Sequence, residues 1–380
     1  MEKKEFPPLF PVALDHAFPD AQQAFEEARD LILNNYYSPA ITKEALYWAA
    51  IEGMLRRVSP PEVPDLAKLW TADQYAKVLE TLTGEQVSLG IKTTFSPSEG
   101  CLTVTDVMAG SPAETILSPM DRILRIGGQP LKGKTVDEVS RLLEGPEGTD
   151  VSLTVNRDIK IFDVSITRQK IETINLQTAQ LTDTVYLIRL KSFPLNISKD
   201  LKESLDKIQA KGAKAVILDL RDNYGGVFSE ALRVADLFVP KSHVILRSVQ
   251  RGSAPQNYVS GNENPCPLGV AILVNRQTAS ASEIVAASLR DNGRAFIVGT
   301  RTFGKGVFEK TFEMKNKCRI KFINGAMYSP KGESWQGRGV VPDFLVDQDA
   351  RTLAQLYKLP VAERFRQDVA MITACKLLLR

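Results

Sequence analysis

Histidine is nearly absent from this sequence, which has only His16 and His243 among its 380 residues. A hydrolase that pairs a serine with a histidine base would need one of these two. His16 lies in a proline-rich start and His243 opens an apolar run, so both are predicted to be surface or strand-end residues. The scarcity therefore disfavours a Ser-His-Asp hydrolase.

Cysteine is also sparse, with four residues spread along the chain. None forms a CxxC pair, and no histidines lie nearby to complete a zinc site. We therefore expect no metal and no cofactor, whereas a disulfide stays open because sequence cannot pair these residues. The four are Cys101, Cys266, Cys318 and Cys375.

Long apolar runs and strong charge are absent as well. No run approaches the ~20 residues that a membrane span requires, and Pro7, Pro8 and Pro11 interrupt the start where a signal core would lie. The net charge of +3 suggests neither nucleic acid nor an anionic membrane as partner. The chain is expected to stay inside the cell or to have had a leader trimmed.

The composition, 43% apolar over 380 residues, supports two or three ordinary cores. Residues 1–85 are predicted to be helical, because Asp20, Thr42 and Thr71 can each cap an apolar-periodic run. Thr71 with Gln74 forms a capping-box pattern. These helices form either a cap on the rest of the protein or an arm that pairs two protomers.

Residues 86–168 change to short apolar strands with one helix near Thr135. The segment resembles a PDZ domain, a peptide-binding module, through SLGI at Ser88–Ile91, DRILRIGG at 121–128 and the helix that follows. Backbone N–H groups at Leu89, Gly90 and Ile91 could bind a terminal carboxylate, while an extended peptide adds as a strand. Gly90 would let the backbone approach that ligand.

Residues 169–346 alternate strands with helices, which predicts a mainly parallel sheet covered by helices. One helix, SKDLKESLDKIQA, is expected to be capped by Ser198. Loops at the carboxyl ends of such strands commonly carry active sites. Two qualify: residues 221–226 (RDNYGG) follow AVILDL, and residues 275–280 follow GVAILV. The predicted fold class is therefore multi-domain α/β, with a helical N-terminal region, a PDZ-like β-barrel domain and a crotonase/ClpP-like core.

The motifs ILDLRDNYGG, TASASEIVAASLRDNGRA, TFGKG and GRGVVPD carry a more specific resemblance. The chain resembles the carboxyl-terminal processing peptidases, also called tail-specific proteases, over roughly residues 80–343. The resemblance implies that Ser280 is a nucleophile and Lys305 its general base. It also implies an oxyanion hole from backbone N–H groups of Ala281 and Gly225, with Gly226 as its neighbour.

A lysine can serve as a base only while it is neutral, which requires a loss of about 3 units from an ordinary pKa near 10.4. Desolvation must supply most of that change. Phe303 and Val307 flank the FGKG turn and are expected to exclude water from Lys305.

Two residues depart from the pattern of the family. Glu309 stands four residues after Lys305, where the family commonly has a supporting glutamine, and an ionised carboxylate there favours the ammonium. Tyr224 stands where proline usually precedes the paired glycines, so the loop is expected to be less restricted. Glu309 therefore decides whether Lys305 can act as the base.

Three functions remain open at this point. The first is a serine endopeptidase that captures carboxyl-terminal tails on the PDZ-like domain and cleaves them at Ser280. The second is a peptide-binding scaffold or pseudoprotease with an idle core, which Glu309 and Tyr224 keep open. The third is a crotonase-like core that acts on acyl thioesters.

The tail, residues 347–380, is expected to form two helices broken at Pro360, whose apolar faces pack on the core or on a second protomer. We expect protein or peptide substrates with free tails, and a homodimer, with an adaptor also compatible. The resemblance implies an exported enzyme of the periplasm or cell envelope, although this sequence shows no leader.

Overall fold

The computed structural model describes residues 20–38, 40–60, 66–82, 85–108, 110–172 and 175–379. His16 and the proline-interrupted start therefore lie outside the described residues. No helix within those ranges is long and apolar enough to cross a membrane.

The N-terminal region is helical, as predicted, and also contributes a short strand. Thr42 caps its helix by accepting the Ala45 N–H, and Thr71 and Gln74 form the expected capping box. Asp20 occupies the N-cap of the first helix, but its side chain makes no capping bond, because its backbone is left-handed. The elements are α1 (Ala21–Asn35), α2 (Lys43–Val58), β1 (Lys68–Trp70) and α3 (Ala72–Leu82).

The PDZ segment is a strand-rich unit with its own core around Ile123, Ile126 and Val155. Its larger sheet has the order β3-β4-β5-β7-β8, so within the described part of the chain one edge of β3 pairs with β4 and the other is free. Thr135 and Glu138 form a capping box at the start of α4. The elements are β2 (Glu85–Ser88), β3 (Ile91–Ser96), β4 (Cys101–Val107), β5 (Arg122–Ile126), β6 (Gln129–Pro130), α4 (Val136–Leu143), β7 (Asp150–Arg157), β8 (Lys160–Thr167) and β9 (Gln169–Glu172).

A six-stranded, mainly parallel sheet forms the α/β core, in the order β10-β11-β12-β15-β16-β19. Only the β10–β11 pair is antiparallel. The apolar runs of its central strands are buried on both faces, which is typical of a parallel sheet covered by helices. The strands are β10 (Leu176–Gln180), β11 (Val185–Leu190), β12 (Ala215–Asp219), β15 (Gly269–Val274), β16 (Ala295–Gly299) and β19 (Phe344–Leu345).

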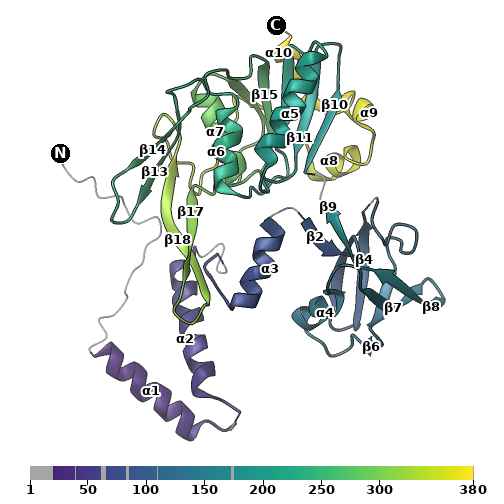
Figure 1. The fold of residues 1–380 in the computed structure, drawn as a ribbon, viewed down its shortest axis with the longest axis vertical. Coiled ribbons are helices and arrows are strands. Elements are labelled where there is room, and N and C mark those ends of the chain that lie inside the picture. Colours follow the sequence, from purple (N-terminus) through teal and green to yellow (C-terminus); the bar gives the residue numbers. More distant parts are fainter. Residues whose placement is uncertain are drawn as a thin grey trace.

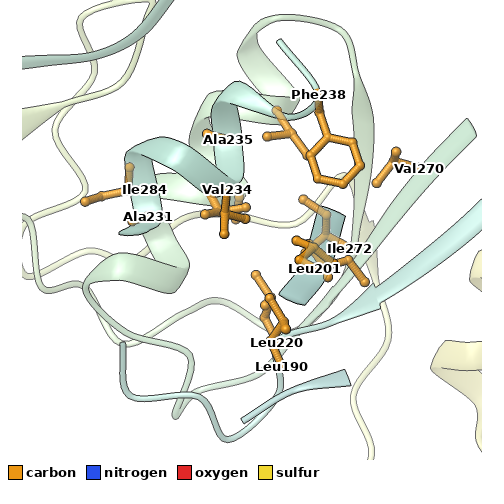
Figure 2. Close-up of a cluster of buried hydrophobic side chains, with 14 of the residues drawn as sticks. Leu190, Leu201, Leu220, Ala231, Val234, Ala235, Phe238, Val270, Ile272 and Ile284 are labelled. Atoms are coloured by element: carbon orange, nitrogen blue, oxygen red, sulfur yellow. The ribbon is translucent and has the colours of Figure 1, made fainter. Parts of the chain in front are cut away.

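Helices cover both faces of this sheet (Figure 1). On one face, α5 (Ile197–Ala210), α6 (Phe228–Asp236) and α7 (Ala281–Asp291) form the largest core cluster with the sheet. Figure 2 shows part of it, where Phe238 and Val234 lie near Ile272. On the other face, α10 (Val369–Leu378) packs its buried residues against the sheet.

Two sequence expectations about helix ends are wrong. α5 begins at Ile197 with Asn196 as its N-cap, so Ser198 lies inside the helix, where its N–H donates to the buried Glu230 carboxylate. The tail forms three helices rather than two, because Asp368 starts a further helix by accepting the Met371 N–H. The first two are α8 (Ala350–Leu356) and α9 (Val361–Phe365).

A second sheet of five strands lies beside the core and receives the strand that follows Lys305. β18 pairs with β17, with β13 and with the N-terminal β1. Besides β1, the sheet consists of β13 (Val244–Gln250), β14 (Gln256–Val259), β17 (Val307–Glu313) and β18 (Arg319–Tyr328). The N-terminal region is thus joined to the core through β1. The predicted limits of the four segments, at 85, 168 and 346, stay predictions.

Candidate active site

Ser280 stands at the start of α7, where the chain turns from β15 into the helix. Its backbone has φ 54° and ψ −114°, outside the regions that non-glycine residues ordinarily adopt. Such strain persists only where the surroundings enforce it, and it is concentrated at functional sites. Ser280 is partly exposed, whereas both of its neighbours, Ala279 and Ala281, are buried. The turn therefore presents the serine at the surface of a rigid element.

The RDNYGG loop, residues 221–226, packs directly against this turn. In the register of the parallel strands Asp219 lies beside Leu273, so both loops leave the sheet at the same edge. The carbonyl oxygen of Asn223 accepts hydrogen bonds from the Ala279 N–H and the Ser282 hydroxyl, each at 3.0 Å. The two loops predicted from strand alternation are thus joined to each other.

Gly225 lies against the serine turn, with no room for a side chain. A Cβ atom there would lie 2.9 Å from Ala279 O, Ala281 N and Ser280 Cβ, and φ is +101°. Only glycine fits this position without displacing the serine turn.

The predicted oxyanion donors are only partly available in this conformation. Within the described residues, the Ala281 N–H donates to no acceptor, as expected for the first turn of a helix. The Gly225 N–H instead donates to Asn223 Oδ1 at 2.9 Å. Gly226 forms an isolated parallel β-bridge with Phe193. The N–H of the next residue, Val227, donates to Phe193 O.

Lys305 is paired with Glu309. The distance from Lys305 Nζ to Glu309 Oε1 is 2.7 Å, with the two side chains 25% and 14% exposed. No hydrogen bond joins the Lys305 ammonium to the Ser280 hydroxyl, two groups that both lie in the described part of the chain. The structure thus pairs the predicted base with the residue that departs from the family pattern.

Two residues were expected to exclude water from Lys305, and only one of them is buried. Val307 is buried, but the Phe303 side chain is 55% exposed, although Gly304 and Gly306 are buried. The turn is held instead by Trp335 and Gln336, which the sequence did not single out. Trp335 Nε1 donates to Lys305 O at 3.0 Å, and the Gly306 N–H donates to Gln336 Oε1 at 2.7 Å.

A second lysine faces Glu309 from β18. In the antiparallel ladder Glu309 lies opposite Ile323 and Thr311 opposite Lys321, so Glu309 and Lys321 are diagonal neighbours on one face. Burial lowers the pKa of Lys321; the Glu309 carboxylate opposes that shift and the Lys305 charge adds to it. Glu309 therefore lies between two cations, an arrangement visible only once the register is known.

The buried carboxylate of Glu283 connects the two halves of the site. It accepts the N–H groups of Ser280 at 2.8 Å and Lys305 at 2.9 Å through Oε2. Through Oε1 it accepts the Gly304 N–H at 2.7 Å and the Thr302 hydroxyl. Sequence reasoning placed Glu283 within a motif but gave it no role.

A buried ion cluster anchors the base of the RDNYGG loop. Arg221 is 2% exposed and pairs with Asp219 and with Asp368 of the C-terminal region, each at 2.8 Å. Burial opposes ionisation of Asp219, but the charge and hydrogen bonds of Arg221 outweigh it and hold the pKa of Asp219 below its usual range. The cluster thus joins the C-terminal helices to the loop that approaches Ser280.

The predicted carboxylate-binding loop lies between β2 and β3. Gly90 has φ +77°, and its N–H is 3.2 Å from Ser88 Oγ. Leu89 is buried, and Ile91 begins the edge strand β3. The loop therefore leads directly into the free edge of the sheet.

The remaining candidate groups contribute little to this site. His243 is exposed before β13, and its Nδ1 lies 3.2 Å from Lys241 O. All four cysteines are free, and no cluster suited to a metal ion occurs among the described residues.

Comparison with known proteins identifies the two units of the chain. Residues 184–346 match peptidase family S41, and residues 103–157 match the PDZ domain. The chain is 32% identical over 320 residues to a probable CtpA-like serine protease of Staphylococcus aureus, across 83% of this chain and 63% of that protein. The corresponding relative from Staphylococcus haemolyticus is 30% identical over 315 residues, across 82% and 62%. The chain thus spans less than two thirds of the length of these curated relatives.

Solved structures share the fold. The photosystem II D1 C-terminal processing protease matches with a TM-score of 0.54 and 22% identity, over 91% of this chain and 99% of that one. An S41 protease from Bacteroides fragilis matches with a TM-score of 0.56 and 17% identity, over 95% and 98%. Residues 184–346 thus match peptidase family S41 and residues 103–157 match a PDZ domain, and the resemblance of the chain to the carboxyl-terminal processing peptidases is confirmed.

Proposed function

We propose that this chain is a serine endopeptidase in which Ser280 is the nucleophile and Lys305 the general base. The observation that carries the proposal is the strained backbone of Ser280 at the start of α7, beside the Ala281 N–H, which has no acceptor among the described residues. Gly225 packs against the same turn, so a substrate carbonyl on Ser280 would meet backbone donors from two loops.

In the proposed reaction, Ser280 Oγ attacks the scissile carbonyl carbon while its proton passes to the neutral Lys305 amine. The negative oxygen of the tetrahedral intermediate accepts the Ala281 N–H and a glycine N–H of the RDNYGG loop, Gly225 or Gly226. The lysine ammonium then protonates the leaving amine as the C–N bond breaks. Water hydrolyses the resulting acyl ester by the same steps in reverse order.

The Lys305–Glu309 ion pair has to open before this reaction can begin, because the Lys305 Nζ atom that would take the Ser280 proton is engaged by the Glu309 carboxylate. The Gly225 N–H also has to leave Asn223 Oδ1 if that glycine is to serve as a donor. In this proposal the two contacts define a resting state, from which the enzyme must rearrange before it can cleave.

Tail capture is proposed for the PDZ domain. The free edge of β3 can accept an extended peptide as an added strand, and the Ser88–Ile91 loop stands at its start to receive the terminal carboxylate. Substrates are therefore proteins or peptides whose carboxyl-terminal tails are unstructured and apolar.

The test is cleavage of a labelled peptide that has an apolar, free carboxyl end. Ser280→Ala is expected to lower kcat by about 10⁴-fold or more, whereas Ser288→Ala, a buried serine on the same helix, serves as the matched control. Amidation of the peptide carboxyl end is expected to raise KM and leave kcat unchanged. Cleavage that survives Ser280→Ala would overturn the proposal.

A scaffold without catalysis is the second candidate, and the ion pair of Lys305 with Glu309 favours it. It predicts that the labelled peptide binds, that amidation weakens binding, and that no cleavage occurs in the wild type or in Glu309→Gln. Cleavage by either protein excludes this candidate.

We also propose a homodimer formed through α1 and α2. No residue of α1 is buried, and Leu31 and Tyr37 are 57% and 98% exposed. Light scattering should show a dimer that Leu31→Glu dissociates. Location outside the cytoplasm and delivery by an adaptor are further proposals, tested by cell fractionation and by pull-down with Ser280→Ala.

A further inference from the structure

The carboxylate of Glu283 is fully buried and serves four donors. Its relative exposure is 0%, and two hydrogen bonds reach each of its oxygens. Ser280 and Lys305 both donate their N–H groups to the same oxygen, Oε2. One atom thus connects the backbone of the proposed nucleophile to the backbone of the proposed base.

Helix capping alone does not account for this arrangement. Glu138 occupies the same N3 position in the capping box of α4, where it is exposed and accepts only from Thr135. Glu283 makes the equivalent bond to the Ser280 N–H, but its other three donors come from residues 302–305, beyond the far end of the helix and β16. The additional bonds tie the FGKG turn to the serine turn.

Burial of this carboxylate carries an energetic cost. Burial raises the pKa of the Glu283 carboxyl above its ordinary value, against hydrogen bonds from Thr302 and three N–H groups that act to lower it. Buried charges are poor contributors to stability compared with apolar residues of similar volume. A buried glutamate at residue 283 is therefore better explained by the geometry that it imposes on the two turns than by a gain in stability.

The bonds of Glu283 also extend beyond the two turns. Thr302 donates its hydroxyl to Oε1 and accepts the Val340 N–H at 2.6 Å, and Val340 belongs to the GRGVVPD motif. Two of the motifs that carry the family resemblance therefore meet at this carboxylate, and a third reaches it through Thr302.

We propose that Glu283 is a positioning residue of the peptidase reaction, whose carboxylate sets the separation of Ser280 and Lys305 by holding both backbones on one oxygen. The inference rests on the proposed function. Glu283 does not touch substrate; it acts through the main chain of the two residues that do.

Glutamine at this position preserves the volume but not the bonding. Its amide nitrogen donates hydrogen bonds, so wherever it points it meets at least one backbone N–H and leaves that donor unpaired. A displacement of about 1 Å between reacting groups can lower the rate by about 10²-fold. Glu283→Gln is therefore expected to lower kcat by about 10²-fold and to change KM by less than about threefold, because no substrate contact is lost.

The experiment measures kcat and KM for cleavage of the labelled peptide by the full chain, together with the fraction folded at the assay temperature. Glu230→Gln is the matched control, since Glu230 is also 0% exposed but binds the Ser198 N–H and Arg233 instead. Glu283→Gln is expected to lose more kcat than its loss of folded protein explains. The kcat of Glu230→Gln is expected to stay near that of wild type. A kcat within about twofold of wild type per folded molecule would overturn the inference.

A second pair of variants covers the case in which Glu283→Gln does not fold. Thr302→Val removes one donor to Glu283 at nearly constant volume, and Thr302→Ser keeps the hydroxyl. The inference predicts a kcat loss of about tenfold in the valine variant and recovery in the serine variant; equal kcat values in the two would contradict it. Failure of the proposed function looks different, because wild type would then cleave nothing or Ser280→Ala would cleave normally.

Discussion

The ammonium of Lys305 and the carboxylate of Glu309, four residues apart in the sequence, form an ion pair of 2.7 Å at the start of β17. Glu309 Oε1 is buried and lacks a hydrogen bond of good geometry, so this contact is mainly one of charge. The pair therefore holds the Nζ atom of the proposed base on Glu309.

Glu309→Gln is expected to raise the rate of peptide cleavage near neutral pH by about two- to fivefold, the range for an ion pair that solvent partly screens. Removing the carboxylate leaves Lys305 Nζ without its ion-pair partner, so the pH-rate profiles of wild type and Glu309→Gln are expected to differ. Glu313→Gln is the control, since Glu313 lies on the same strand but pairs with Lys317 and Arg319. Superimposable profiles for wild type and Glu309→Gln would show that Glu309 does not govern the base.

Gly225→Ala is expected to abolish most cleavage, by about 10²- to 10³-fold. The added methyl group would push against Ala279, Ser280 and Ala281, and displace the donors from the serine. Gly212→Ala separates this effect from backbone strain, because Gly212 also has a positive φ, +87°, but nothing lies within 4 Å of its Cβ position. If the two variants lose activity equally, close approach at Gly225 is not the cause.

Asp368→Asn is expected to lower the free energy of unfolding by about 2–4 kcal/mol, measured by urea denaturation, because it leaves a buried charge on Arg221 less well paired. Asparagine caps helices about as well as aspartate, so the change isolates the lost charge. Asp349→Asn is the control, because Asp349 is exposed and accepts the Thr352 N–H at the start of α8. A similar loss in both variants would argue against a special role for the buried pair.

Asp121→Asn is expected to destabilise the PDZ domain by about 1–3 kcal/mol at pH 7, because Arg157 and the Ser118 N–H lose their charged acceptor. Burial opposes ionisation of Asp121, but these bonds outweigh it and hold its pKa below the usual range. The stabilisation is present above the unfolded pKa of about 3.9 and is lost as pH falls through the folded value.

The difference between Asp121→Asn and wild type should therefore shrink from pH 7 to pH 3 in calorimetric scans of the full chain. Asp163→Asn is a suitable control, because Asp163 bonds only a threonine hydroxyl on the neighbouring strand. A difference that is constant with pH would mean that ionisation of Asp121 contributes nothing.

The sequence predicts the elements of the candidate site better than its connections. Runs such as AVILDL and GVAILV are continuous and apolar, so the parallel sheet and the edge that carries residues 221–226 and 275–280 follow from strand alternation. The role of Glu283 does not follow, because a glutamate three residues into a helix is typical of an ordinary capping box.

Contacts that depend on the register of paired strands could not be predicted from the sequence either. Lys321 stands twelve residues after Glu309 along the chain, and only the ladder of β17 and β18 places both on one face. Phe303 was expected to cover Lys305 because it is large and apolar, but its direction depends on a turn that Glu283, Trp335 and Gln336 hold. A capping-box glutamate whose helix starts at a candidate nucleophile is the pattern that could have drawn attention to this network.

The position of α10 has a consequence for biosynthesis. Both loops of the proposed site leave the ribosome well before Asp368, yet Arg221 reaches its second carboxylate only when that late residue docks. The opposite face of the sheet, which Ala370, Met371 and Ala374 cover, also stays bare until then. A nascent chain would therefore carry Ser280 and Lys305 on an incomplete core until α10 has been synthesised, so the proposed peptide cleavage is expected only after that helix docks.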